Sequence, residues 1–147
     1  MASCALWCAI ALGAAGGPEH DLLDPEQAFR LSAGMPDPRT IEVRYRVAEG
    51  YYLYKARLAF STDNPAVRLG APQLPAGEWH EDEFFGRSEI YRGEVTIRIP
   101  LDGQAAGRFT LIAVSQGCAD VGVCYLPLTQ RALLFPARPG GKQSQKP

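Results

Sequence analysis

The 147-residue sequence has no excess of charge of either sign, because 15 lysines and arginines oppose 16 aspartates and glutamates for a formal net charge of −1. A basic field that would attract nucleic acid or an anionic membrane is therefore missing, and we expect no nucleic-acid partner. The sequence also lacks a Ser-His-Asp arrangement, a phosphate-binding glycine loop and an HExxH motif. The common hydrolase, nucleotide-binding and metalloprotease signatures are thus unsupported.

An apolar run long enough to cross a bilayer is also absent from the start of the chain, since residues 1–15 fall short of the roughly 20 residues that a spanning helix needs. This segment ends in small residues that suit a signal peptidase, although no Lys or Arg precedes it. We expect residues 1–17 to be a signal peptide; the alternative is an apolar segment docked on the domain. Residues 18–136 should form one domain, and residues 137–147 a linker or disordered tail.

Sustained helical periodicity is missing as well, while 12 prolines and 15 glycines interrupt the chain. This pattern favours short strands separated by turns, with a single helical turn that has Asp24 as its cap and Pro25 at its first position. We therefore expect an immunoglobulin-like antiparallel β-sandwich, with a small closed barrel as the alternative. The clearest strand pattern is the alternation of apolar and charged residues at 41–47, and further strands are expected within 52–60, 95–99, 109–114 and 126–135.

Cysteines are few, and two of the four, Cys4 and Cys8, lie in the expected signal peptide. The remaining pair, Cys118 and Cys124, would lie within disulfide reach in a hairpin or short loop. A disulfide that closes so small a loop stabilises by about 2 kcal/mol in the chain-entropy model, which is a weak constraint. The pair is either a static disulfide or a redox-active one; a zinc site is disfavoured because the spacing matches no zinc pattern, and a CxxC motif is absent.

The segment 79–91 has an unusual composition for a loop, with three consecutive acids, two phenylalanines and a glycine. An exposed phenylalanine forgoes roughly 1.5–3 kcal/mol of burial, so Phe84 or Phe85 should have an apolar contact. These rings either plug the open end of the sandwich or cover a reactive disulfide. The acids Asp82, Glu83 and Asp120 would raise the pKa of a nearby thiol, which suits a disulfide that waits for a partner's thiolate.

Three segments carry a resemblance to a known family. Residues 114–127 resemble the active-site segment of the N-terminal periplasmic domain of the thiol:disulfide interchange protein DsbD, residues 79–92 resemble its cap loop, and residues 50–54 resemble a third segment. The order and spacing agree over residues 24–135, and the family's domain is an immunoglobulin-like sandwich. Phe85 stands where a tyrosine is expected in the family.

The resemblance implies a redox pair in which Cys124 forms mixed disulfides with partners and Cys118 resolves them. Phe84 would cap the disulfide and move aside when a partner docks. The remaining implied site residues are Asp82, Glu83, Phe85 and Gly86 of the cap segment, with Tyr52 and Tyr54 lining the site. No cofactor or metal is implied beyond the disulfide itself.

The implied function is that of a periplasmic, monomeric protein-disulfide reductase domain within a larger inner-membrane system. It would accept electrons from a thioredoxin-like or transmembrane partner, and would reduce periplasmic disulfide isomerases and a cytochrome c maturation thioredoxin. The sequence contains neither a transmembrane nor a thioredoxin-like domain, so we expect one domain of a larger or split protein. Two alternatives remain: a binding module with a static disulfide, and a copper-tolerance relative with a different acceptor.

Overall fold

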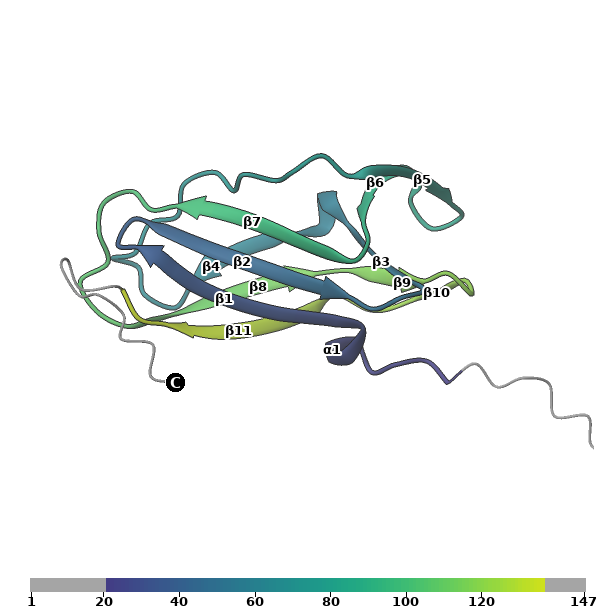
Figure 1. Cartoon of the computed structure of the whole chain (residues 1–147), viewed down its shortest axis with the longest axis horizontal. Coiled ribbons are helices and arrows are strands. Elements are labelled where there is room, and N and C mark those ends of the chain that lie inside the picture. Colours follow the sequence, from purple (N-terminus) through teal and green to yellow (C-terminus); the bar gives the residue numbers. More distant parts are fainter. Residues whose placement is uncertain (1–20, 137–147) are drawn as a thin grey trace, which may run out of the picture.

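The computed structural model describes residues 21–136, so the expected signal peptide and C-terminal tail lie outside the described residues. The described chain is almost entirely β-structure (Figure 1). Its elements, in chain order, are α1 (Pro25–Ala28), β1 (Phe29–Asp37), β2 (Thr40–Val47), β3 (Tyr51–Tyr54), η1 (Lys55–Arg57), β4 (Ala59–Thr62), β5 (Glu78–Asp82), β6 (Gly86–Tyr91), β7 (Glu94–Pro100), β8 (Phe109–Ser115), β9 (Gly117–Ala119), β10 (Val123–Cys124) and β11 (Leu128–Leu134).

The strands form two facing layers that are joined at one end by a third sheet. The strand orders are β1-β2-β7 and β11-β8-β4 in the two layers, and β10-β9-β3-β6-β5 at the end that lies on the right in Figure 1. Each of these strand pairs is antiparallel. The fold is therefore the expected immunoglobulin-like antiparallel sandwich. The closed-barrel alternative is wrong, because pairing in residues 21–136 runs in three separate sheets.

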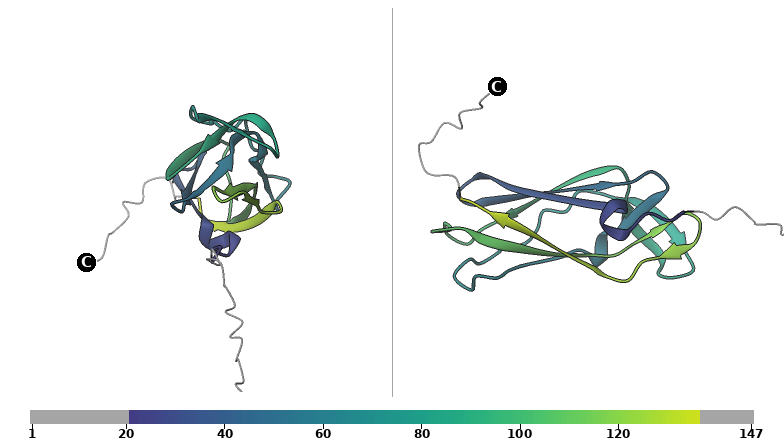
Figure 2. Two further views of the ribbon diagram at one scale, coloured as in Figure 1. Left: turned by 90° about the vertical axis from the view of Figure 1, so that its right-hand side faces the viewer. Right: turned by 90° about the horizontal axis from the view of Figure 1, so that it is seen from below.

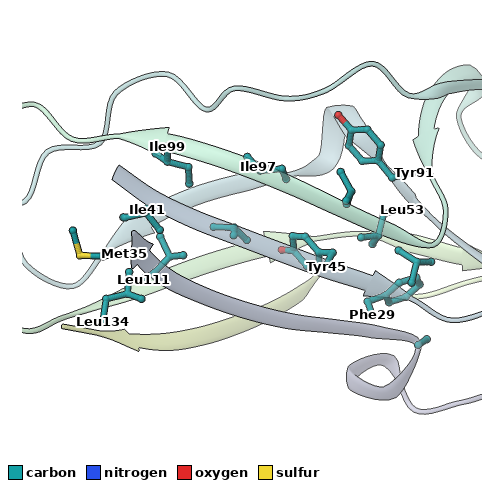
Figure 3. Close-up of a cluster of buried hydrophobic side chains, with 14 of the residues drawn as sticks. Phe29, Met35, Ile41, Tyr45, Leu53, Tyr91, Ile97, Ile99, Leu111 and Leu134 are labelled. Carbon is teal, nitrogen blue, oxygen red and sulfur yellow. The ribbon is translucent and has the colours of Figure 1, made fainter. Parts of the chain in front are cut away.

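The alternation at residues 41–47 explains how the sandwich forms. In β2 the side chains of Ile41, Val43 and Tyr45 are buried, whereas Arg44 and Arg46 point to solvent. A strand of period two that buries one face is stable only against a second apolar layer. That layer comes mainly from the facing sheet β11-β8-β4. Figure 3 shows the shared core, in which the labelled residues are Phe29, Met35, Ile41, Tyr45, Leu53, Tyr91, Ile97, Ile99, Leu111 and Leu134.

The single strand expected at residues 52–60 is wrong, because the structure divides it in two. β3 ends at Tyr54, the 3₁₀ turn η1 follows, and β4 begins at Ala59. β3 pairs with β6 and β9 in the five-stranded sheet, whereas β4 pairs with β8 in the other layer. The turn lets the chain change sheets, and it leaves all four residues of β3 buried at the end of the sandwich.

Two other strands change sheets at the same end of the molecule. β8 runs into β9 with only Gln116 between them, and β6 runs into β7 through Arg92 and Gly93. Figure 2 (left) looks onto this end, where the five-stranded sheet closes the sandwich. The short helix α1 begins at Pro25 after Asp24, as expected. Within residues 21–136, no helix has the length and apolarity that a membrane crossing requires.

Candidate redox site

The two cysteines lie opposite each other in a small hairpin. β9 and β10 pair so that Cys124 faces Cys118, and the two form a disulfide with their Cα atoms 3.9 Å apart. Gly122 makes the turn possible with a φ of +90°, and its N–H donates to the carbonyl of Ala119 at 3.0 Å. The hairpin expected from the six-residue spacing is therefore present.

The two sulfur-bearing residues differ in accessibility. Cys118 is 0% exposed and belongs to a small buried cluster with Tyr52, Tyr54 and Ile90. Cys124 is only partly buried and packs against the outside of that cluster. A thiolate from another protein must reach a sulfur along the axis of the disulfide, so access favours attack at Cys124.

Gly117 explains why the cysteine hairpin lies so close to the tyrosines. A Cβ at this position would clash with the carbonyl oxygen of Tyr52 and would lie 2.6 Å from the Phe29 ring. Only glycine permits this close approach between β9 and β3. The pairing of β3 with β9 then places Tyr52 opposite Cys118.

Tyr54 brings its hydroxyl to the disulfide. The oxygen lies 3.2 Å from Sγ of Cys118 and 3.9 Å from Sγ of Cys124. The Tyr52 ring packs edge-on against the Tyr54 ring, with centroids 5.5 Å apart. Tyr54 therefore contacts the disulfide, and Tyr52 lies beside Tyr54 and opposite Cys118 in the sheet.

Asp82 is the hydrogen-bonding centre of the site. Its Oδ2 accepts from the hydroxyls of Tyr54 at 2.5 Å and Tyr52 at 3.0 Å. Its Oδ1 accepts from the backbone N–H groups of Phe84 and Phe85, each at 2.9 Å. One carboxylate thus connects the tyrosines beside the disulfide to the turn between β5 and β6.

These contacts move the pKa values of the site in opposite directions. Burial acts to raise the pKa of Asp82, but hydrogen bonds from Tyr54, Phe85, Tyr52 and Phe84 hold it below its usual value. Burial, together with the hydrogen bond to Asp82, raises the pKa of Tyr54 well above that of a free phenol. Tyr54 therefore stays protonated. Because its hydroxyl donates a hydrogen bond to Asp82, it has limited freedom to donate to the sulfurs.

The composition of residues 79–91 predicts a loop, but these residues form a β-hairpin of β5 and β6 with a tight turn. The expectation was wrong because the alternation of side chains in β5 is masked by the run of acids. Asp82 ends β5, and Gly86 begins β6 with a φ of +64°. The turn between them carries Glu83, which is exposed.

The two phenylalanines of this turn have different surroundings. The Phe85 ring packs edge-on against the Tyr54 ring at 4.6 Å between centroids and belongs to the cysteine-containing cluster. The guanidinium of Arg57 lies over the Phe85 ring, 4.3 Å from its centroid. Phe84 is 44% exposed at the tip of the same turn. Phe85 is thus an anchor of the turn, whereas the role of Phe84 as a cap stays a prediction.

The structure adds neighbours that sequence reasoning did not assign to the site. The His80 ring lies 4.6 Å from the Tyr52 ring, and its Nε2 lies 3.8 Å from Oδ2 of Asp82. Arg92, just after β6, forms an ion pair with Asp120 in the cysteine hairpin. A strand assignment for residues 78–82 would have placed His80 on the same face as Asp82, because alternate residues of a strand share one face.

Comparison with known proteins agrees with this geometry. The sequence profile described as "Thiol:disulfide interchange protein DsbD, N-terminal" matches residues 19–136. The chain belongs to this DsbD N-terminal family. Family membership and the Cys118–Cys124 disulfide together support thiol-disulfide interchange as the chemistry of the site.

Relatives in the DsbD family cover most of the chain. It is 45% identical over 109 residues to the thiol:disulfide interchange protein DsbD 1 of Pseudomonas aeruginosa, a match that covers 74% of this chain and 18% of that protein. The DsbD protein of Ralstonia nicotianae is 44% identical over 118 residues, covering 80% of this chain and 19% of the relative. The chain thus spans less than a fifth of the length of these relatives.

Solved structures show the same fold. The N-terminal domain of Neisseria meningitidis DsbD in the reduced form is 40% identical, with a TM-score of 0.73, and the match covers 78% of this chain and 90% of that one. A complex of the DsbD and PilB N-terminal domains from the same organism matches with 40% identity and a TM-score of 0.66, over 77% and 87% of the two chains.

Asp82→Asn should destabilise the domain, because the variant loses charge-assisted hydrogen bonds to the tyrosines and the turn. We expect a loss of about 1–3 kcal/mol in the free energy of unfolding at pH 7, measured by urea denaturation. The folded-state pKa of Asp82 lies below the unfolded value of 3.8, so its contribution is present above that pH and disappears as the pH falls through the folded pKa.

The difference between wild type and Asp82→Asn should therefore shrink when the same measurement is made at pH 3. A matched control is Asp102→Asn, a change at an exposed carboxylate whose distance to Arg68 is 3.9 Å. This control should stay within about 0.5 kcal/mol of wild type. An equal stability of Asp82→Asn and wild type at pH 7 would contradict the central position assigned to Asp82.

Proposed function

We propose that the domain is a two-electron carrier of the periplasm. It accepts electrons from a thioredoxin-like or transmembrane partner of the same system and passes them to periplasmic disulfide isomerases and a cytochrome c maturation thioredoxin. The observation that carries this proposal is the asymmetry of the disulfide, in which Cys118 is fully buried and Cys124 is partly exposed. A structural disulfide has no need for one accessible sulfur, whereas a carrier must offer one sulfur to each partner.

The exchange proceeds through a mixed disulfide. The thiolate of a reduced donor attacks Sγ of Cys124, the Cys118–Cys124 bond breaks, and its electron pair leaves with Cys118. The second thiolate of the donor then attacks its own sulfur in the mixed disulfide, which releases the oxidised donor and a Cys124 thiolate. Both domain thiolates take up protons. The domain has gained two electrons, and the donor has lost two.

Delivery of electrons reverses these steps. Cys124 of the reduced domain attacks the disulfide of an acceptor, and an acceptor thiolate leaves. Cys118 then attacks Cys124 to restore the internal disulfide and release the reduced acceptor. Pairing of Cys118 and Cys124 in adjacent strands keeps the second sulfur within reach throughout, so resolution is intramolecular and fast.

The surface around Cys124 suits brief contact with a protein partner. Val121, Val123 and Leu126 follow the chain around the cysteine hairpin and are exposed, Leu126 to 86%. Exposed apolar side chains beside a reactive group are typical of protein-binding surfaces. A surface built from these three side chains is small, and small interfaces are usual for redox proteins that must release each partner.

The turn between β5 and β6 carries two further residues with proposed roles, Glu83 and Phe84. We assign Phe84 as the ring that covers the Cys124 side of the disulfide in the absence of a partner, and Asp82 as the residue that holds the turn in place. Gly86 lets the turn close with its positive φ. Asp82 and Glu83 add negative charge to the site, which disfavours a thiolate in the resting reduced domain.

An equilibrium redox titration against glutathione or thioredoxin tests the proposal. A carrier should equilibrate with a reduced thioredoxin-like protein, and its potential should lie above about −300 mV. A potential far below that value, with no exchange with thioredoxin-like proteins, would instead identify a binding module with a static disulfide.

A further inference from the structure

Arg92 spans the end of the five-stranded sheet beside the redox pair. Its Nη1 and Nη2 donate to Oδ2 and Oδ1 of Asp120 at 3.1 and 2.9 Å, and its Nε donates to Oε1 of Glu78 at 2.9 Å. Nη1 also donates to the carbonyl of Tyr51 at 3.2 Å, and the guanidinium carbon lies 5.1 Å from the centre of the Tyr52 ring. One side chain thereby joins the cysteine hairpin to β3 and β5.

Asp120 lies inside the loop that the disulfide closes. It follows Cys118 by two residues, and its N–H donates to the carbonyl of Gly50 at 2.8 Å, which fixes the start of the turn. Asp120 acts on the site through its charge. The pKa of Tyr52, the residue paired with Cys118, is raised first by the burial of Tyr52 and then by Asp82 and Asp120. Without a cation beside it, this carboxylate would add to the negative charge that Asp82 already provides.

We propose that Arg92 is a positioning residue for thiol-disulfide exchange, which pairs with Asp120 so that an attacking thiolate meets less negative charge at the Cys118–Cys124 disulfide. The proposal rests on the function proposed above. A bidentate guanidinium–carboxylate pair suits this task because its geometry is fixed by two parallel hydrogen bonds. Other charged or titratable groups around the site are Glu78, His80 and Asp82 of β5, Glu83 of the turn, Tyr52 and Tyr54 of β3, and Arg57 beside Phe85.

The reaction that Arg92 assists is the first attack on the oxidised domain. A small thiolate forms a bond to Sγ of Cys124, and the electron pair of the broken disulfide moves to Cys118. A second molecule of the small thiolate attacks the mixed disulfide, leaves as the oxidised thiol dimer and frees Cys124. The small thiol is the reductant, and water supplies the two protons that the domain thiolates take up.

The test compares two small thiols of different charge on the oxidised full chain. The thiolate of 2-mercaptoethanesulfonate carries two negative charges, whereas that of cysteamine is balanced by its ammonium group. The rate constants of reduction are corrected for the thiolate fraction of each reagent. The quantity compared is the rate constant with 2-mercaptoethanesulfonate divided by that with cysteamine. In Arg92→Ala this ratio should fall about two- to fivefold at low salt, and the effect should vanish near 1 M salt, where the Debye length is about 3 Å.

Companion variants separate charge from loss of structure. Asp120→Asn should raise the ratio, the double variant Arg92→Ala/Asp120→Asn should return close to wild type, and Arg92→Lys should recover most of the loss. Arg46→Ala is the matched control, since Arg46 pairs with Glu94 in the sandwich and should leave the ratio unchanged. A ratio unchanged in both Arg92→Ala and Asp120→Asn, or equal acceleration with both thiols, would overturn the proposal. Failure of the proposed function would appear differently, as a wild-type domain that reacts with both small thiols but not with a thioredoxin-like protein.

Discussion

Cys118→Ser should leave a domain that forms a stable mixed disulfide through Cys124, whereas Cys124→Ser should form one far more slowly. The reason is access: Cys124 is partly exposed, while Cys118 is fully buried beneath Tyr52 and Tyr54. In Cys118→Ser, no second thiol remains to resolve the product. We expect the two variants to differ in rate by at least about tenfold, because exchange depends on the access of the attacked or attacking sulfur.

The measurement uses a thioredoxin-like protein that retains a single active-site cysteine, activated as its mixed disulfide with 5-thio-2-nitrobenzoate. Attack by the domain thiolate joins the two proteins and releases the coloured nitrothiobenzoate, so absorbance gives the rate and a non-reducing gel shows the product. Cys118→Ser/Cys124→Ser is the control and should release no colour. Faster complex formation by Cys124→Ser than by Cys118→Ser would reverse the roles assigned to the two cysteines.

Local pattern predicted much of the sandwich but not its change of sheets. The alternation at residues 41–47 is a property of one strand that buries one face, so this strand could be predicted from the sequence alone. Residues 52–60 keep an apparent period of two through η1, yet their halves pair with different strands. The order of strands in a sheet is decided by contacts between residues far apart in the sequence, and the local pattern does not predict these contacts.

The same distinction applies to the redox site. The pairing of Cys118 with Cys124 depends on six residues of local chain, so spacing predicted it. The hydrogen bonds from Tyr52 and Tyr54 to Asp82 instead depend on the order β3-β6-β5 in one sheet. The acids of residues 81–83 predicted an effect on the pKa of a nearby thiol. The structure shows that one of them, Asp82, also holds the turn between β5 and β6.

Phe84→Ala should speed the reduction of the oxidised domain by a small uncharged thiol such as 2-mercaptoethanol. Phe84 is 44% exposed in the turn that Asp82 holds, so its ring is not part of the core and its removal need not disturb the packing. We expect the second-order rate constant of reduction to rise about fivefold, because removal of the ring opens access to Cys124. The free energy of unfolding should change by less than about 1 kcal/mol, as for other half-exposed positions.

Phe85→Ala is the matched control, since it removes a neighbouring ring of equal size from the same turn. Phe85 packs against both Tyr54 and Arg57, so its loss should cost about 2 kcal/mol of stability. If Phe85→Ala also speeds reduction, the increase should grow with urea, because it would arise from local opening of the destabilised turn. The increase in Phe84→Ala should be independent of urea, since a missing shield needs no opening. A fast, urea-independent reaction in Phe85→Ala, with wild-type rates in Phe84→Ala, would show that Phe85 is the shield and that the cap has been assigned to the wrong ring.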